Sequence, residues 1–192
     1  FDRQLALLRQ ELLIPGFSVA IIQDDSIVFA KGYGFSDLIQ LVPAEPETCY
    51  KIASLSKPVA SFLLHRYQQT GILSLTDPAE KYGINFGNSK SLRLYHILSH
   101  TSENKPGKRF YYNGYRFGAL DSVFRQVTGL NYAAVLHRDF ISLLGLENTA
   151  PGFLSIGIPV DVRDPRNANV VSRLSKVYTL NSEGKARETS YP

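Results

Sequence analysis

The pattern of apolar and polar positions predicts a helix, a hairpin and a second helix in the first part of the chain. Residues 2–13 carry leucines at helical spacing, and a Pro-Gly pair ends that pattern. Two segments rich in β-forming residues, 17–22 and 27–30, flank a polar turn and predict a β-hairpin. After a polar loop over 36–48, helical spacing returns over 54–70 and stops at a glycine.

The second half reads as a helical region followed by short strand-like pieces. The spacing predicts a short helix over 92–99 and amphipathic helices over 117–128 and 132–144, each of the latter two stopped by a glycine. Strand-like pieces follow at 156–162 and 170–180. A turn at 164–167 separates these two pieces, and a hairpin turn at 181–184 follows the second.

The composition is that of an ordinary globular protein and argues against several function classes. Of the 192 residues, 44% are hydrophobic and 20% are charged, which is enough apolar material for one or two packed domains. The net charge is +4 and the cations are scattered, so no nucleic-acid-binding face is expected. No apolar run reaches the roughly 18 residues of a membrane span, which predicts a soluble chain and leaves its compartment open.

Two further compositional features concern cysteine and methionine. Cys49 is the only cysteine, so no disulfide can form within these residues, and its neighbours predict a buried thiol. The sequence begins at Phe1 and contains no Met. This suggests a processed or partial form of a longer chain.

Ser54 and Lys57 are the candidate catalytic pair. They stand three positions apart at the start of a predicted helix, a spacing that puts the hydroxyl and the amine side by side on one face. A serine hydroxyl is a weak nucleophile at neutral pH and needs a neighbour that takes its proton. Two other Ser-x-x-Lys pairs, 102–105 and 182–185, lie in polar stretches that read as loops. The alternative interpretation makes Ser54 a helix cap and Lys57 a solvated side chain.

His96 and His100 are four residues apart at the predicted 92–99 helix. A zinc site would need a third ligand, and no Asp or Glu accompanies the pair. We therefore predict a capped and packed helix end and no metal site.

Seven short blocks together resemble a known superfamily. They are PGFSVA at 15–20, GYG at 32–34, IASLSKP at 52–58, LSLTDP at 73–78, HILSHTS at 96–102, PGKRFYYN at 106–113 and LGLENT at 144–149. Their order resembles the serine β-lactamase and penicillin-binding-protein superfamily, in which Ser-x-x-Lys is a catalytic motif. The similarity is greatest to the class C β-lactamase-related branch, with its esterases, D-aminopeptidases and carboxypeptidases. A plain α+β domain with chance motif matches is the competing interpretation.

The resemblance implies an α+β fold, with an antiparallel sheet flanked by helices and a mostly helical subdomain, as in β-lactamases and transpeptidases. Residues 1–50 would supply the N-terminal helix and the first strands of the sheet. Residues 51–150 would form the helical region with the Ser-x-x-Lys and Tyr-x-Asn motifs. Residues 151–192 would begin the return to the sheet, whose C-terminal strands are lacking here. The hairpin over 17–34 should then show an open edge unless further chain or a partner pairs with it.

The resemblance also implies roles for four residues. Ser54 matches the acylated nucleophile, and Lys57 matches the lysine that helps to deprotonate it. Tyr111 and Asn113 match the Tyr-x-Asn motif, in which the tyrosine relays a proton to the leaving group and the asparagine holds the substrate amide. The expected activity is that of a serine hydrolase, which needs no metal or cofactor and acts on an ester, amide or β-lactam carbonyl of a small molecule or peptide. The residues do not distinguish these carbonyls and leave the oligomeric state open.

The sequence departs from the family pattern in two places, and the first departure favours a different function. The third family motif, Lys or His followed by Thr or Ser and then Gly, is absent from these residues. Only residues 103–105 separate the His-Thr-Ser block from the next Pro-Gly, where relatives have a longer stretch. The alternative is a catalytically silent, penicillin-binding-like sensor or binding protein on the same fold.

Overall fold

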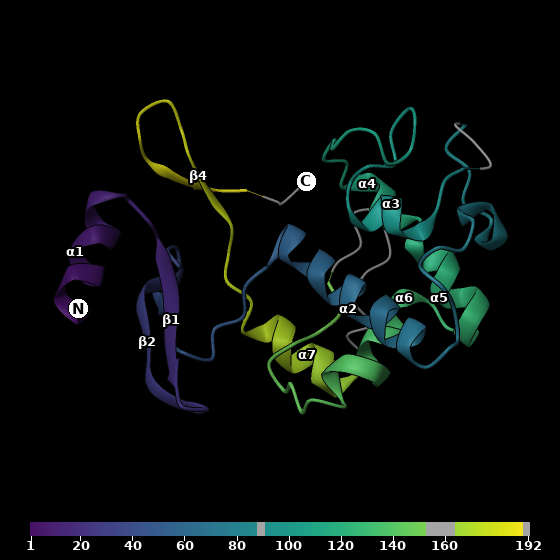
Figure 1. Ribbon diagram of the computed structural model, residues 1–192. Coiled ribbons are helices and arrows are strands. Elements are labelled where there is room, and N and C mark those ends of the chain that lie inside the picture. The colour runs from purple at the N-terminus through teal and green to yellow at the C-terminus, as the bar shows by residue number, and fades with distance from the viewer. Residues whose placement is uncertain (88–90, 153–163, 190–192) are drawn as a thin grey trace. The chain divides into compact units, whose positions relative to one another are not determined.

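The computed structural model describes residues 1–87, 91–152 and 164–189. The chain divides into two compact units (Figure 1). The first consists of Phe1–Lys51 with Glu147–Pro192, and the second of Ile52–Leu146. Among the described residues, no helix combines the length and the apolarity that crossing a bilayer requires.

The first unit opens with a helix packed beside a β-hairpin, as the sequence predicts. Helix α1 spans Asp2–Glu11, and strands β1 (Gly16–Gln23) and β2 (Ser26–Asp37) pair antiparallel (Figure 1). The side chain of Asp2 accepts hydrogen bonds from Lys31 and Tyr33 on β2, which ties the helix to the hairpin. The short strand β3 (Val42–Pro43) pairs with the other edge of β2.

Strand β1 leaves an open edge in the described part of the chain, because its only partner strand there is β2. The exposed apolar residues of the hairpin are Ile21, Ile22, Ile27 and Val28. Large apolar side chains and unpaired strand edges are normally covered in a stable sheet. In the described part of the chain, β1 has the open edge that was expected for residues 17–34.

The sequence prediction for the end of the first unit is partly wrong. Residues 165–172 form helix α7 (Pro165–Ser172), whereas the pattern predicted a turn at 164–167 and a strand from residue 170. Asp164 caps this helix by accepting from the N–H of Arg166, and proline is favourable at the first helical position. A strand begins only at β4 (Tyr178–Leu180), and its hairpin with β5 (Ala186–Glu188) turns at 181–184 as predicted. The predicted strand at 156–162 lies outside the described residues.

The second unit is helical. A 3-10 turn, η1 (Ala53–Leu55), leads into helix α2 (Ser56–Gln69), which ends before Gly71 as predicted. The unit continues with η2 (Ala79–Tyr82), α3 (Leu94–Leu98), α4 (Tyr115–Gly118), α5 (Leu120–Thr128), α6 (Tyr132–Leu136) and the π-helical η3 (His137–Ile141). The two long helices predicted over 117–128 and 132–144 are thus each divided, into α4 with α5 and into α6 with η3. The largest fully buried core side chains are Leu63, Leu64, Leu94, Ile97, Leu120, Val123, Phe124 and Val135.

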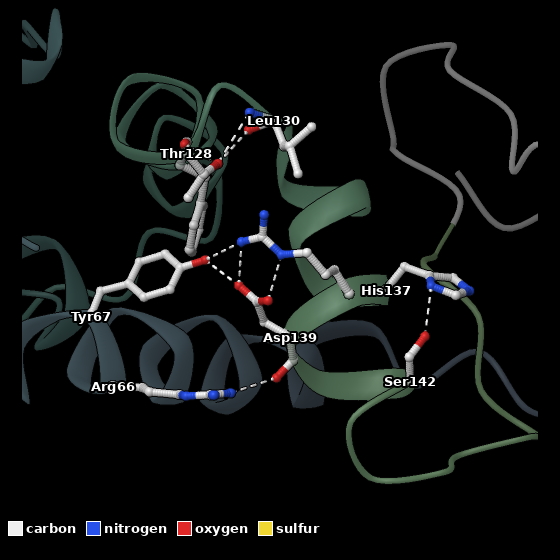
Figure 2. A network of polar contacts seen from close by, with 9 residues as sticks. Arg66, Tyr67, Thr128, Leu130, His137, Asp139 and Ser142 are labelled. Atoms are coloured by element: carbon white, nitrogen blue, oxygen red, sulfur yellow. Dashed lines mark hydrogen bonds and ion pairs between the residues drawn. The ribbon is translucent and has the colours of Figure 1, made fainter. Parts of the chain in front are cut away.

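A polar network fixes α2 to η3 inside this unit (Figure 2). The carboxylate of Asp139 accepts from the Tyr67 hydroxyl and, at 2.6 and 2.7 Å, from the Arg138 guanidinium. The main-chain oxygen of Asp139 accepts from Arg66, 3.0 Å away. Burial, followed by the bond to Asp139, raises the pKa of Tyr67 to about 12, so the phenol stays protonated and keeps donating. The network thereby steadies the helix whose first turn carries Lys57.

The turn at 73–78 is organised by the carboxylate of Asp77. It accepts from the Tyr82 hydroxyl at 2.6 Å, from the Lys81 ammonium at 2.9 Å and from the N–H of Ser74 at 3.1 Å. These bonds, the one from Tyr82 first, lower the pKa of Asp77 to about 2. Because an unfolded aspartate titrates near 3.9, the resulting stability is complete above about pH 4 and is lost as the pH falls toward 2.

We predict that Asp77→Asn lowers the free energy of unfolding at pH 7 by on the order of 1–2 kcal/mol, and that its difference from the wild type shrinks between pH 4 and pH 2. Urea unfolding at pH 7, 4, 3 and 2 measures both effects. The control is Glu80→Gln, which removes an exposed carboxylate from the neighbouring turn. A difference between Asp77→Asn and wild type that is the same at pH 7 and pH 2 would contradict the assignment.

Candidate active site

Ser54 lies in a backbone turn of unusual conformation. It is the middle residue of η1, and the residue before it, Ala53, has φ of +44°. A non-glycine residue in this left-handed region is strained, and such strain often marks functional turns. Lys57 and Pro58 follow in the first turn of α2, where proline sacrifices no helical hydrogen bond. Ser54 therefore sits at the amino end of a helix, where free N–H groups and the helix dipole favour negative charge.

The structure brings Ser54 and Lys57 into contact, as their spacing predicts. The Lys57 Nζ donates to the Ser54 Oγ over 2.8 Å. The other two Ser-x-x-Lys pairs differ in their surroundings. Ser102 is buried while Lys105 is exposed, and Lys185 pairs with Glu183 at 3.0 Å. At 54–57 the amine and the hydroxyl share a direct hydrogen bond at the start of a helix, where their spacing predicts it.

The tyrosine hydroxyl that contacts Ser54 belongs to Tyr112, whereas the motif match predicts Tyr111. The Tyr112 Oη donates to the Ser54 Oγ over 2.6 Å. Both tyrosines are exposed to a similar extent, 57% for Tyr111 and 50% for Tyr112, so the hydroxyl contact and not burial distinguishes them. Hydrogen bonding with Lys57 first, and with Ser54 second, lowers the pKa of Tyr112. The lysine also lies 5.3 Å from the centre of the Tyr112 ring.

Motif spacing favoured Tyr111 because an asparagine stands two positions after it. Consecutive side chains outside helices point to different sides of the chain, so only one of two adjacent tyrosines can face Ser54. The main-chain N–H of Tyr111 donates to the main-chain oxygen of His100 over 2.7 Å. This bond helps to determine which of the two tyrosine side chains faces Ser54. This contact joins residues that are distant in sequence, and nothing in the residue pattern indicates it.

The side chain of Asn113 is engaged inside the protein. Its Nδ2 donates to Glu103 over 2.7 Å, and its Oδ1 accepts from the N–H of Tyr115 at 3.1 Å. Glu103 in turn pairs with Arg116 at 2.7 Å, and both of these side chains are largely buried. These bonds use one N–H and one oxygen lone pair of the Asn113 amide, and they fix its orientation.

The position two residues after Tyr112 is Gly114. A Cβ at Gly114 would lie 3.4 Å from the Lys57 Nζ and 3.9 Å from the Tyr112 Oη. Position 114 therefore borders the lysine and the phenol but offers them no side chain. If Tyr112 is the motif tyrosine, the motif's asparagine position is occupied by glycine in this protein.

The short link before the tyrosines is a closed turn. The N–H of Gly107 donates to the oxygen of Thr101 over 2.8 Å, and Gly107 has φ of +80°. A Cβ at this position would also lie only 3.0 Å from the Nε2 of His96. Glycine is favoured there for both reasons, and residues 103–105 pass directly from one block to the next.

The two histidines each bind a backbone N–H. The Nδ1 of His96 accepts from Arg93 at 3.0 Å and so caps α3. The Nδ1 of His100 accepts from Asn113 at 3.3 Å. Burial lowers the pKa of both rings, and the charge of Lys57 lowers that of His100 further. In the part of the chain that the structure describes, no three His, Cys, Asp or Glu side chains are grouped to hold a metal ion.

A family model for β-lactamases matches residues 1–173 of the sequence. The chain belongs to the β-lactamase family. The match covers both the hairpin of the first unit and all the residues grouped around Ser54 in the second.

Within the β-lactamase family, the chain is similar to two curated proteins of Staphylococcus aureus. Protein flp of strain NCTC 8325 / PS 47 is 24% identical over 173 residues, which cover 71% of this chain and 35% of flp. Teichoic acid D-alanine hydrolase is 26% identical over 159 residues, which cover 69% of this chain and 40% of that protein. The chain thus spans well under half the length of these relatives.

Solved structures of the β-lactamase family share the fold. The octameric penicillin-binding protein homologue from Pyrococcus abyssi matches with a TM-score of 0.81 and 23% identity, covering 97% of this chain and 49% of that one. The D-alanine carboxypeptidase AmpC from Burkholderia cenocepacia matches with a TM-score of 0.76 and 23% identity, covering 100% and 56%. The predicted α+β, β-lactamase/transpeptidase-like fold is confirmed.

Proposed function

We propose that this protein is a serine hydrolase that forms an acyl-enzyme at Ser54. The observation that carries the proposal is the convergence of Lys57 and Tyr112 on one serine oxygen, at 2.8 and 2.6 Å. A lysine and a phenol of lowered pKa on the same hydroxyl form the arrangement that proton transfer from a serine requires. Membership of a family that includes serine hydrolases supports the same reaction.

In the proposed acylation step, Tyr112 acts as the base in its phenolate form. The Lys57 ammonium stabilises the phenolate, which accounts for the direction of the Tyr112 pKa shift. The Ser54 proton passes to the Tyr112 Oη while the Ser54 Oγ attacks the carbonyl carbon. The tetrahedral intermediate collapses, the bond to the leaving group breaks, and Tyr112 returns the proton to that group.

In the proposed deacylation step, water takes the place of the Ser54 hydroxyl as the nucleophile, and Ser54 becomes the leaving group. Water attacks the acyl carbon and gives a proton to the Tyr112 phenolate, and Tyr112 passes that proton to the Ser54 Oγ as the acid product leaves. The position of Ser54 at the amino end of α2 supports both steps, because negative charge develops beside the helix N-terminus in each.

We propose esters as the first substrates to test. The carboxamide of Asn113 is held by Glu103, and Gly114 provides no side chain, so the groups that would hold a substrate amide are engaged or missing. An activated ester needs the least assistance from such groups. The similarity to a teichoic acid D-alanine hydrolase and to a D-alanine carboxypeptidase makes D-alanyl esters and D-alanyl peptides the natural comparison.

A panel of p-nitrophenyl esters, a D-alanyl ester, a D-alanyl peptide and nitrocefin tests this proposal. We expect ester turnover before strong nitrocefin turnover, with Ser54→Ala giving the background rate for each compound. Robust nitrocefin hydrolysis without ester cleavage would reverse the ranking. No Ser54-dependent turnover of any compound would contradict hydrolysis.

A second candidate function is a catalytically silent binding or sensor protein. The engagement of Asn113 by Glu103 favours it. In that case Ser54 would still be acylated, but the acyl group would persist. Covalent labelling without turnover separates this function from hydrolysis.

A further inference from the structure

His100 holds the backbone on both sides of Tyr112. Its main-chain oxygen accepts from the N–H of Tyr111 at 2.7 Å, and its Nδ1 accepts from the N–H of Asn113 at 3.3 Å. His100 thus holds the peptide group between Phe110 and Tyr111 with its backbone, and the peptide group between Tyr112 and Asn113 with its side chain.

The ring of His100 also packs directly on the tyrosine. Its centroid lies 4.5 Å from that of Tyr112, with the rings tilted by 37°. Phe117 of α4 and Phe110 pack against the same imidazole at 5.1 and 5.9 Å. Lys57 of α2 lies 5.7 Å from the Phe117 ring and is the charged side chain that influences the imidazole from that helix. The imidazole is therefore enclosed by aromatic rings beside the catalytic lysine.

The contacts at His100 define which ring nitrogen carries the proton. An Nδ1 that accepts from Asn113 has no proton of its own, so the neutral ring is protonated at Nε2. A proton on Nδ1 would oppose the N–H of Asn113 and break this bond. The backbone of His100 has φ of +53°, a conformation that asparagine and glycine also tolerate.

We propose that His100 is a positioning residue for Tyr112, acting through the hydrogen bond from the Asn113 N–H to its Nδ1. This inference rests on the proposed function, because it assumes that Tyr112 serves Ser54. Holding the backbone one residue before Tyr112 and directly after it helps to set where the Tyr112 hydroxyl lies relative to the Ser54 Oγ. A displacement of about 1 Å at such a distance lowers rates by about 10²-fold.

Two substitutions at position 100 test the Nδ1 acceptor separately from the backbone, because asparagine and glycine both tolerate the positive φ of this residue. His100→Asn can place its amide oxygen near the position of Nδ1, whereas His100→Gly has no acceptor. We expect His100→Asn to be acylated within about 5-fold of the wild-type rate and His100→Gly to be slower by about 10- to 100-fold, with the affinity for the probe unchanged. The matched control is His96→Asn, which changes the same kind of N–H acceptor away from Ser54 and should retain the wild-type rate.

The measurement is the saturating acylation rate and the half-saturating concentration of a fluorophosphonate, for the wild type and the three variants. Equal rates for His100→Asn and His100→Gly, or a wild-type rate in His100→Gly, would overturn the proposal. Failure of the wild type itself to be labelled at Ser54 would instead contradict the proposed function. Nitrogen-15 NMR of the His100 ring gives a test that is independent of activity. An Nε2–H tautomer supports the assignment, and an Nδ1–H tautomer overturns it.

Discussion

Lys57→Ala should lower the rate of Ser54 acylation by about 10³- to 10⁴-fold, the upper part of the range for general acid–base groups. The effect is large because the substitution removes two interactions together. The Ser54 Oγ loses its 2.8 Å bond, and Tyr112 loses the hydrogen bond that contributes most to its lowered pKa. A stopped-flow or quenched assay with an activated ester measures the first-order acylation rate.

The matched control for this prediction is Lys105→Ala, because Lys105 also stands three positions after a serine but is exposed. We expect it to retain the wild-type rate within about 2-fold, as surface substitutions usually have small effects. An acylation rate in Lys57→Ala within about 10-fold of wild type would show that the lysine does not support proton transfer by Tyr112.

Tyr112→Phe should lower the acylation rate by about 10²- to 10³-fold, while Tyr111→Phe should leave it nearly unchanged. Both substitutions keep the aromatic ring and remove one hydroxyl oxygen. They differ because the Tyr112 oxygen is the one that bonds to Ser54. Phenylalanine at 112 also keeps the aromatic contact with His100. The measurement is the same acylation assay, with urea unfolding as a check that both variants fold.

The pH dependence separates the two tyrosines further. Because the pKa of Tyr112 is lowered, its phenolate should form below pH 10, and the wild-type acylation rate should rise with pH in that range. This rise should persist in Tyr111→Phe and disappear in Tyr112→Phe. A rise that disappears in Tyr111→Phe and persists in Tyr112→Phe would assign the role of the base to Tyr111.

The sequence predicts the parts of this protein that depend on neighbouring residues. The contact of Ser54 with Lys57 follows from helical spacing, and the hairpin over 17–34 follows from β-forming segments around a polar turn. Local signals were also present where the prediction failed, since Asp164 followed by proline is a helix start. The β-branched residues Val170 and Val171 favour a strand, whereas the Asp164 cap favours the helix that forms.

The parts that the sequence does not predict depend on contacts between distant residues. The choice of Tyr112 over Tyr111 involves hydrogen bonds to His100, and the position of Asn113 depends on Glu103. Both are set by how the turn at 101–107 folds back, and motif spacing carries no information about that. For this physical reason the motif match indicates a segment that contacts Ser54 but names Tyr111, whereas the contact is made by Tyr112.

The most direct test of the account is the mass of the protein after incubation with a fluorophosphonate or a β-lactam, followed by peptide mapping. We predict a single adduct on Ser54 in the wild type and in Ser56→Ala, where the substitution is two residues away, and no adduct in Ser54→Ala. No adduct from any such probe, or an adduct on another residue that persists in Ser54→Ala, would contradict the assignment of Ser54 as the nucleophile.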